Sequence, residues 1–272
     1  MRAEDYQMTK VTEVLSQQKP IFICDFTPPR GADPSLLDGA SNLHAADFVS
    51  VAYNPGKLVR LDSAAAAYQI RQRFERDVVF NLSPRDMNKI AIESHLLGAS
   101  ALGLENVMVL QGDPIFERDA TTQVADFQTT SLIAAIADLN NGLDYRGSKL
   151  RSATDFCIGA TMDPTRPLER EVRLARRKAE AGAHFLLTQP VFSAAGVSLI
   201  RETYRAENRL ELERSVFWGV QVLSQDGILF SSVPEAIRQQ VDAGRDGVDI
   251  ALEVFRNLEE AGEKPFTWSH PS

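Results

Sequence analysis

Several short apolar runs of this chain end in side chains that can exchange a proton or form a hydrogen bond. The clearest example is the segment LQGDP at residues 110–114, which ends the apolar run 107–110. A glycine lets the backbone approach a ligand closely, because it carries no side chain. The carboxylate of Asp113 would then face that ligand. This spacing is typical of a site for a flat polar molecule.

The same pattern recurs at other points where an apolar run ends. The polar residues at these ends are Asp25, Tyr53, Asn81, Gln111 with Asp113, Thr161, Gln189 and Gln221. Buried polar groups are costly unless they are paired, so a chain that repeats them at strand ends is expected to use them. Any single member could instead satisfy the backbone of a loop. As a set, they predict a ring of strand ends around one site.

Asp25 is the best candidate for a proton donor. It lies between an apolar run and a rigid Pro-Pro turn at residues 28–29. Partial loss of water at such a position raises the pKa of a carboxyl group and suits it to donate a proton. The alternative is that the carboxylate only caps the turn that follows it.

The elements that position these residues alternate along the chain. Apolar runs that read as buried strands cover residues 20–26, 48–53, 77–82, 106–110, 156–160, 184–189, 216–223 and, more weakly, 264–268. Helical patterns cover residues 61–74, 86–103, 131–141, 168–182, 194–205, 234–244 and 248–261. Strands that alternate with helices in this way favour a closed (β/α)8 barrel, with a doubly wound open sheet as the main competitor.

The expected fold class is therefore α/β, as a single (β/α)8 TIM barrel over residues 1–272 with an extra N-terminal helix at residues 4–18. Within it, Asp62 and Ser63 are cap candidates for the helix at 61–74. The segment from Ser83 to Asp86 has the pattern of a capping box that begins the helix at 86–103. The active site of such a barrel lies at the C-terminal ends of its strands.

Composition narrows the functional class. The chain has 272 residues, 44% of them hydrophobic and 24% charged, and a formal net charge of −8. This acidic balance argues against general nucleic-acid or anionic-membrane binding. The two cysteines and four histidines share no metal-ligand spacing, so we expect no metal. Without a signal pattern or a long apolar run, the protein is expected to be cytoplasmic.

A basic triplet, Arg176–Lys178, leaves a local phosphate site open. It lies in the helix predicted at 168–182. A triplet of this kind is usually a solvated surface, but guanidinium and ammonium groups also match phosphate oxygens. The acidic segment 114–128 is long for a strand-to-helix connection and could be either a lid or a surface loop.

Four short motifs together resemble the methylenetetrahydrofolate reductase family, which are flavoprotein barrels of one-carbon metabolism. They are CDFTPPR at 24–30, DMNKIA at 86–91 followed by LLGA at 96–99, LQGDP at 110–114, and AGA at 181–183 followed by TQ at 188–189. The resemblance runs from about residue 20 to residue 223. Each motif is short, but their order and spacing together are specific.

The resemblance implies hydride transfer from NADH or NADPH through FAD to 5,10-methylenetetrahydrofolate, giving 5-methyltetrahydrofolate. It gives Asp25 the role of general acid and has Asp113 face the pterin and the flavin. It places Gln189 and Gln221 at the substrate. It assigns FAD contacts to Asn81, Gln111, Gly112, Asp113, Thr161, Glu171, Arg177 and Lys178.

The chain also departs from that family. Asp25 replaces a glutamate, Asn81 a histidine and Gln111 an arginine. Near the end of the chain, FTWSHPS at 266–272 replaces a segment with a tyrosine and an arginine, and Trp268 could stack in place of the tyrosine. The alternatives are a folate-binding or methyl-transfer barrel without flavin, or a subunit that needs a partner protein. A homo-oligomer is also possible.

Overall fold

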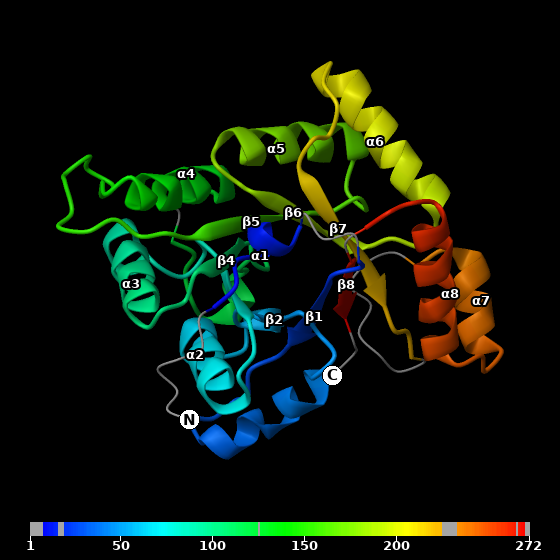
Figure 1. The fold of residues 1–272 in the computed structure, drawn as a ribbon, viewed down its shortest axis with the longest axis horizontal. Coiled ribbons are helices and arrows are strands. Elements are labelled where there is room, and N and C mark those ends of the chain that lie inside the picture. Colours follow the sequence, from blue (N-terminus) through cyan, green and yellow to red (C-terminus); the bar gives the residue numbers. More distant parts are fainter. Residues whose placement is uncertain (1–7, 16–18, 125, 225–232, 265, 270–272) are drawn as a thin grey trace.

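Eight parallel strands close into a barrel in a computed structural model of the chain, which describes residues 8–15, 19–124, 126–224, 233–264 and 266–269. The strands follow chain order around the barrel (Figure 1). They are β1 (Phe22–Phe26), β2 (Phe48–Val51), β3 (Val78–Leu82), β4 (Asn106–Val109), β5 (Cys157–Met162), β6 (Phe185–Pro190), β7 (Ser215–Gln221) and β8 (Phe266–Ser269). Closure between β1 and β8 confirms the TIM barrel and excludes the open sheet.

The strands are apolar throughout because both of their faces are covered. Alternate side chains point into the barrel, where Ile23, Phe48, Val79, Met108, Cys157, Phe185 and Phe217 form a separate interior cluster. The other side chains point outward and pack beneath the helices in a larger core, as Phe80 and Trp218 do. This is why both faces read as hydrophobic in the sequence.

A short N-terminal helix, α1 (Val11–Val14), covers the end of the barrel at which the strands begin. Val11 is fully buried and belongs to the interior cluster. Its backbone N–H donates to Asn106 Oδ1 at 2.9 Å. The extra helix predicted at 4–18 is therefore four residues long where the structure describes it; residues 4–7 and 16–18 lie outside the described part.

The outer layer is helical. Its α-helices are α2 (Ser63–Phe74), α3 (Lys89–Ala101), α4 (Thr129–Asn140), α5 (Leu168–Glu180), α6 (Ala194–Asn208), α7 (Glu235–Asp242) and α8 (Gly247–Glu260). Short 3-10 segments are η2 (Pro34–Leu43), η3 (Pro55–Lys57) and η4 (Glu117–Asp119). Among the described residues, η2 stands where a first crossover helix would be, and both α7 and α8 lie between β7 and β8 (Figure 1).

Helix starts were predicted unevenly. Asp62 caps α2 as expected, because its carboxylate accepts from the N–H of Ala65 at 2.9 Å. The capping box predicted at residues 83–86 is wrong, since Asn88 caps α3 instead. Asp86 is instead held by the guanidinium of Arg85, at 2.6 Å from Nε and 2.7 Å from Nη2.

Trp268 does not stand where a ring could stack on a ligand in the barrel. It packs on the outside of the barrel, with ring centroids 6.4 Å from Phe22 and 5.9 Å from Phe255 of α8. Strand alternation explains this, because Trp268 lies on β8 beside Cys24, whose side chain also faces outward. The last three residues of the C-terminal motif lie outside the described part of the chain.

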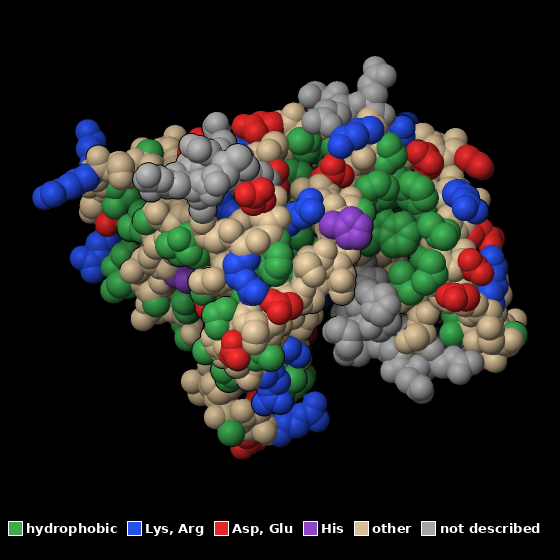
Figure 2. All heavy atoms as spheres, turned by 60° about the horizontal axis from the view of Figure 1, so that its bottom comes forward, with side chains coloured by type: hydrophobic (Ala, Val, Ile, Leu, Met, Phe, Trp, Pro, Cys, Tyr) green, Lys and Arg blue, Asp and Glu red, His purple; other side chains and the backbone are tan. Residues whose placement is uncertain are grey.

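The surface carries charged side chains of both signs, and Figure 2 shows them interspersed over one face of the molecule. No helix in the described part of the chain is long and apolar enough to cross a membrane. Nor do the described residues bring together three His, Cys, Asp or Glu side chains that could hold a metal ion.

Candidate functional site

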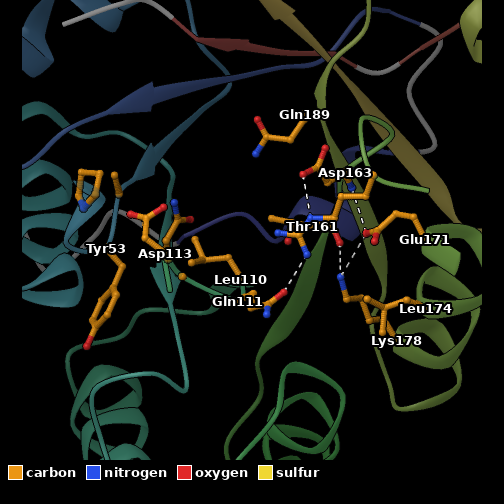
Figure 3. Close-up of a pocket in the computed structure, with 15 residues that line it drawn as sticks. Tyr53, Leu110, Gln111, Asp113, Thr161, Asp163, Glu171, Leu174, Lys178 and Gln189 are labelled. Atoms are coloured by element: carbon orange, nitrogen blue, oxygen red, sulfur yellow. Dashed lines mark hydrogen bonds and ion pairs between the residues drawn. The ribbon is translucent and has the colours of Figure 1, made fainter. Parts of the chain in front are cut away.

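A cavity of about 290 Å³ lies at the C-terminal ends of the strands, where barrel sites are expected. Nine of the residues predicted for the site line it: Tyr53, Asn81, Gln111, Gly112, Asp113, Thr161, Glu171, Lys178 and Gln189. In Figure 3, Tyr53 and Asp113 lie on one side of the cavity and Gln189, Thr161 and Glu171 on the other. Three predicted residues, Asp25, Arg177 and Gln221, do not line it.

The turn after β4 needs its glycine. Gly112 has a φ of 75°, and a Cβ there would lie 2.5 Å from Ser83 Oγ. That hydroxyl donates to the carbonyl of Gln111 at 3.0 Å, which holds the turn against the β3 loop. The backbone of residues 111–113 therefore forms part of the cavity wall with no side chain at its centre, as the sequence pattern predicts.

We expect Gly112→Ala to weaken ligand binding at the cavity at least tenfold. The added Cβ would displace Ser83 and force an alanine into the left-handed region, at a cost of roughly 1–3 kcal/mol. Gly147→Ala is the matched control, because Gly147 has a φ of 74° and open space around it, away from the cavity. Denaturant unfolding and ligand titration of both variants would check this. Equal affinity in the two variants would contradict it.

Asp113 has a structural partner as well as a place in the cavity. Its Oδ2 accepts from the backbone N–H of Gly56 at 2.9 Å, so it links the β4 loop to η3. The guanidinium of Arg85 also reaches the Asp113 carbonyl, at 3.4 Å. One oxygen of the Asp113 carboxylate is thus hydrogen-bonded to the backbone, and this bond fixes the direction of the other oxygen.

Asp25 lies at the open mouth of the barrel, next to the cavity. It pairs in register with Ser50 of β2, whose hydroxyl donates to Asn81 Oδ1 at 3.4 Å. The Asp25 side chain is exposed because the mouth is open. The surrounding barrel wall still removes enough water to raise the pKa of Asp25 to about 6, although hydrogen bonding with Ser50 opposes the shift. This direction of shift is the one predicted for a proton donor.

A buried ion pair supports the β5 side of the cavity. Lys178 and Glu171 are each 4% exposed. Lys178 Nζ donates to the Thr161 carbonyl at 2.6 Å and lies 4.0 Å from Glu171 Oε1, which accepts from the Asp163 N–H at 3.0 Å. Burial lowers the pKa of Lys178, and the charge of Glu171 partly opposes this. The pair therefore fastens the loop between β5 and α5.

The side chains of the basic triplet Arg176–Lys178 do not meet at one place. Arg176 binds Glu180 and the carbonyl of Asn208 on the outer side of α5. Arg177 is exposed and does not line the cavity, whereas Lys178 is turned inward. Three successive residues on a helix point in three directions, so a phosphate clamp formed by the whole triplet is not possible here.

Sequence reasoning missed Arg166. It lines the cavity, donates to Gln111 Oε1 at 3.0 Å, and pairs with Asp163 at 3.1 Å. Its side chain is 51% exposed. The sequence does contain a signal for this residue, because Asp163 and Arg166 form an oppositely charged pair in a turn with two prolines, at residues 163–167, directly after a strand.

A polar network joins the loops that follow β2, β3 and β4. Arg85 is 4% exposed and holds Asp86 with two hydrogen bonds. Burial and the adjacent Asp86 raise the pKa of Tyr53, which lies 9% exposed in the cavity wall. The segment 114–128 is tied in as well, through an Asp119–Lys57 ion pair at 2.7 Å and a Val124 N–H bond to the Arg85 carbonyl.

The two glutamines predicted for the substrate have different surroundings. Gln189 of β6 lines the cavity, where its amide lies in the open space that Figure 3 shows. Gln221 of β7 is 2% exposed and belongs to the packed wall of the barrel instead. Both stand at strand ends, as the sequence indicates, but the cavity includes only Gln189.

Fold and site together define a (β/α)8 barrel with a polar ligand cavity at its strand ends. The family model described as methylenetetrahydrofolate reductase matches residues 10–206. The chain therefore belongs to the methylenetetrahydrofolate reductase family.

Individual relatives are distant. Methylenetetrahydrofolate reductase 1 of Schizosaccharomyces pombe is 23% identical over 183 residues, which are 64% of this chain and 28% of that protein. The chain thus matches little more than a quarter of that relative's length.

Solved structures share the fold. A Clostridium thermocellum protein described as binding two copies of 5-methyl-5,6,7,8-tetrahydrofolic acid matches with a TM-score of 0.66 and 12% identity, covering 95% of this chain and 91% of that one. A 2,3-dimethylmalate lyase matches with a TM-score of 0.54 and 13% identity, over 96% and 80%. At these identities the likeness concerns the fold alone.

Proposed function

We propose that this chain is a folate-dependent oxidoreductase that interconverts 5,10-methylenetetrahydrofolate and 5-methyltetrahydrofolate. One observation carries the proposal: hydrogen-bonding groups from four different strand ends, Asn81, Asp113, Thr161 and Gln189, converge on one cavity. Family membership and the folate described for the Clostridium thermocellum protein support a folate as the ligand.

The cavity suits a flat heterocycle. Pockets for small ligands measure roughly 300–1,000 Å³, so this one offers space for a ring system and not for a whole dinucleotide. Leu110 and Leu174 provide apolar contacts, and the Gly112 turn provides a backbone surface without a side chain. Amide and hydroxyl groups around it match the donors and acceptors of a pterin or a flavin ring.

The residues present fit the ring of FAD. Asn81, Thr161 and the backbone of residues 111–113 would hold that ring, and Arg166, the half-exposed cation of the lining, would meet the diphosphate. When bound, FAD would supply the hydride transfer between NADH or NADPH and the folate. The protein itself would contribute orientation and charge.

Asp25 would supply the proton. In its protonated form it would donate to N10 of the folate, so that the five-membered ring opens and the methylene carbon can accept hydride. Its place next to Ser50 and Asn81 links it to the cavity through polar side chains. Asp113, fixed by Gly56, would set the charge facing the rings.

We expect the rate of methylenetetrahydrofolate reduction to fall as the pH rises through about 6. The pKa of Asp25 is raised to about 6, so the proton donor is present below that pH and is lost tenfold per pH unit above it. Measuring kcat/KM from pH 5 to pH 8 checks this, because it reports the free enzyme's essential acid. The reduction of flavin by NAD(P)H, which needs no such acid, is the control. A flat folate profile would contradict the assignment.

A folate-binding barrel without flavin is the second candidate. The charges of the cavity wall favour this second candidate. The wall has three acidic residues, Asp113, Asp163 and Glu171, and two basic residues, Arg166 and Lys178. Each basic residue already pairs with an acidic one, Arg166 with Asp163 and Lys178 with Glu171. A diphosphate would have to compete with these acids. A neutral pterin ring would not.

Anaerobic calorimetric titration with 5-methyltetrahydrofolate tests the folate proposal. We expect wild-type protein to bind and Gln189→Leu to bind at least tenfold more weakly, since its amide faces the cavity. Gln69→Leu, at a half-buried position of α2 that does not line the cavity, is the control and should bind like wild type. A wild-type protein that does not bind this folate would overturn the proposal.

A further inference from the structure

The outward side of α3 is uncharged. Every residue of this helix is described, and none of its exposed residues carries a charge. Ile90, Leu97 and Leu102, which ends the helix, are 62%, 38% and 41% exposed. The residues we call the α3 outer face are Ile90, Ala91, Leu97, Gly98, Ala101 and Leu102.

This composition is unusual for the outer layer of this barrel. Two of the 13 residues of α3 are charged, against eight of the 13 of α5. Of these two, Glu93 is buried, and Lys89 lies over the ring of Phe127 with its Nζ 5.3 Å from the centroid. A helix that is apolar on both sides normally has a covering on both. Figure 1 places α3 in the outer layer between α2 and α4, with its outer side uncovered in the single chain.

We propose that a second copy of this chain covers the α3 outer face, with the two α3 helices antiparallel about a two-fold axis. Residues at equal distances before and after residue 96 on this face are similar in kind. An antiparallel pair therefore places Ile90 opposite Leu102 of the second copy, and Ala91 opposite its Ala101. Ser94, also exposed, would face Gly98, and these small residues let the helices approach closely. A self-complementary face of this kind closes with two copies.

The charges at the two ends of α3 also fit this arrangement. Asp126 lies at the N-terminal end, where its Oδ2 accepts from the Lys89 N–H at 3.3 Å. Arg71 lies at the C-terminal end, where its Nη1 donates to the carbonyls of Leu102 and Gly103. Antiparallel packing sets Asp126 of one copy near Arg71 of the other, twice, while Lys89, at the same end as Asp126, stays over the ring of Phe127. It also sets the two helix dipoles in opposite directions, which is favourable. A parallel arrangement would bring like ends together.

Sedimentation velocity of the full chain at micromolar concentration tests the proposal. We expect wild type to sediment with twice the mass of one chain. Leu97→Glu should raise the dimer dissociation constant at least 100-fold, because a carboxylate would be buried close to its own copy at the axis. Since Leu97 is exposed in the single chain, the far-ultraviolet circular dichroism should stay unchanged. Leu199→Glu on α6, where the leucine is 55% exposed, is the control and should remain dimeric.

A disulfide test checks the orientation. In one chain, positions 91 and 101 are about 15 Å apart along the helix axis, too far for an internal disulfide. Oxidised Ala91→Cys/Ala101→Cys protein should form a covalent dimer, and each single variant should not. A monomeric wild type, a dimer that Leu97→Glu leaves intact, or a double variant that does not cross-link would overturn the proposal.

Discussion

Replacing Asp25 by asparagine should lower the rate of methylenetetrahydrofolate reduction by about 10²–10⁴-fold, the usual contribution of a general acid. The amide keeps the size of the side chain and its place beside Ser50, but it cannot donate the proton. Reduction of the flavin by NAD(P)H should stay within twofold of wild type. Stopped-flow measurement of the two half-reactions separates these effects. Equal loss in both would assign Asp25 a structural role.

The stability of the same variant provides an independent control. Because the folded protein raises the pKa of Asp25 to about 6, the folded state binds the proton more tightly than the unfolded state. Its contribution to stability is therefore present at low pH and is lost as the pH rises through about 6. Asp25→Asn should then match wild type near pH 4 and be at least as stable at pH 8. A variant destabilised equally at both pH values would indicate a packing defect.

Lys178→Met should destabilise the protein by about 3–5 kcal/mol, the usual cost of removing one partner from a buried ion pair. It would leave Glu171 buried without its cation and the Thr161 carbonyl without its donor. Urea unfolding of variant and wild type measures the difference. The neighbouring Arg177→Met is a close control, because Arg177 is exposed and should change stability by less than about 0.5 kcal/mol.

The double variant Lys178→Met/Glu171→Gln distinguishes the cause of that loss. If the unpaired carboxylate dominates, removing its charge should recover at least half of the lost free energy. If the double variant recovers none of the lost free energy, the hydrogen bond to Thr161 matters more than the ion pair. Equal stability of Lys178→Met and Arg177→Met would contradict the buried placement of Lys178 altogether.

Strands and their polar ends were the most predictable part of this protein. A strand buried on both faces must be apolar over its whole length, so the transition to a polar residue marks its end directly. All eight strands lie within two residues of the expected boundaries at their N-terminal ends. Asn81, Gln111, Thr161 and Gln189 reach one cavity because parallel strands in a barrel end on the same side.

Loop contacts were less predictable. Ser83 to Asp86 has the local pattern of a helix start, but the guanidinium of Arg85 also donates to the Asp113 carbonyl, on a loop 28 residues away. Local patterns carry no information about such a partner. The same holds for Arg166, whose partner Gln111 lies on another strand end.

Helix faces explain the remaining errors. Arg177 and Lys178 are adjacent in sequence and were assigned together, but neighbouring residues on a helix point about 100° apart. Only the apolar spacing of Val172 and Ala175 indicates which side of α5 is buried, and Lys178 falls on that side. Trp268 was misplaced for a similar reason, since strand alternation directs it outward.

The visible absorption spectrum of the purified protein, recorded without oxygen, tests the proposed function most directly. After incubation with FAD, we expect a bound flavin spectrum that NADH or NADPH bleaches and that 5,10-methylenetetrahydrofolate then restores. The donor that bleaches it would identify the nicotinamide. A protein that binds 5-methyltetrahydrofolate but stays colourless with FAD would contradict the oxidoreductase proposal and favour a folate-binding barrel without flavin.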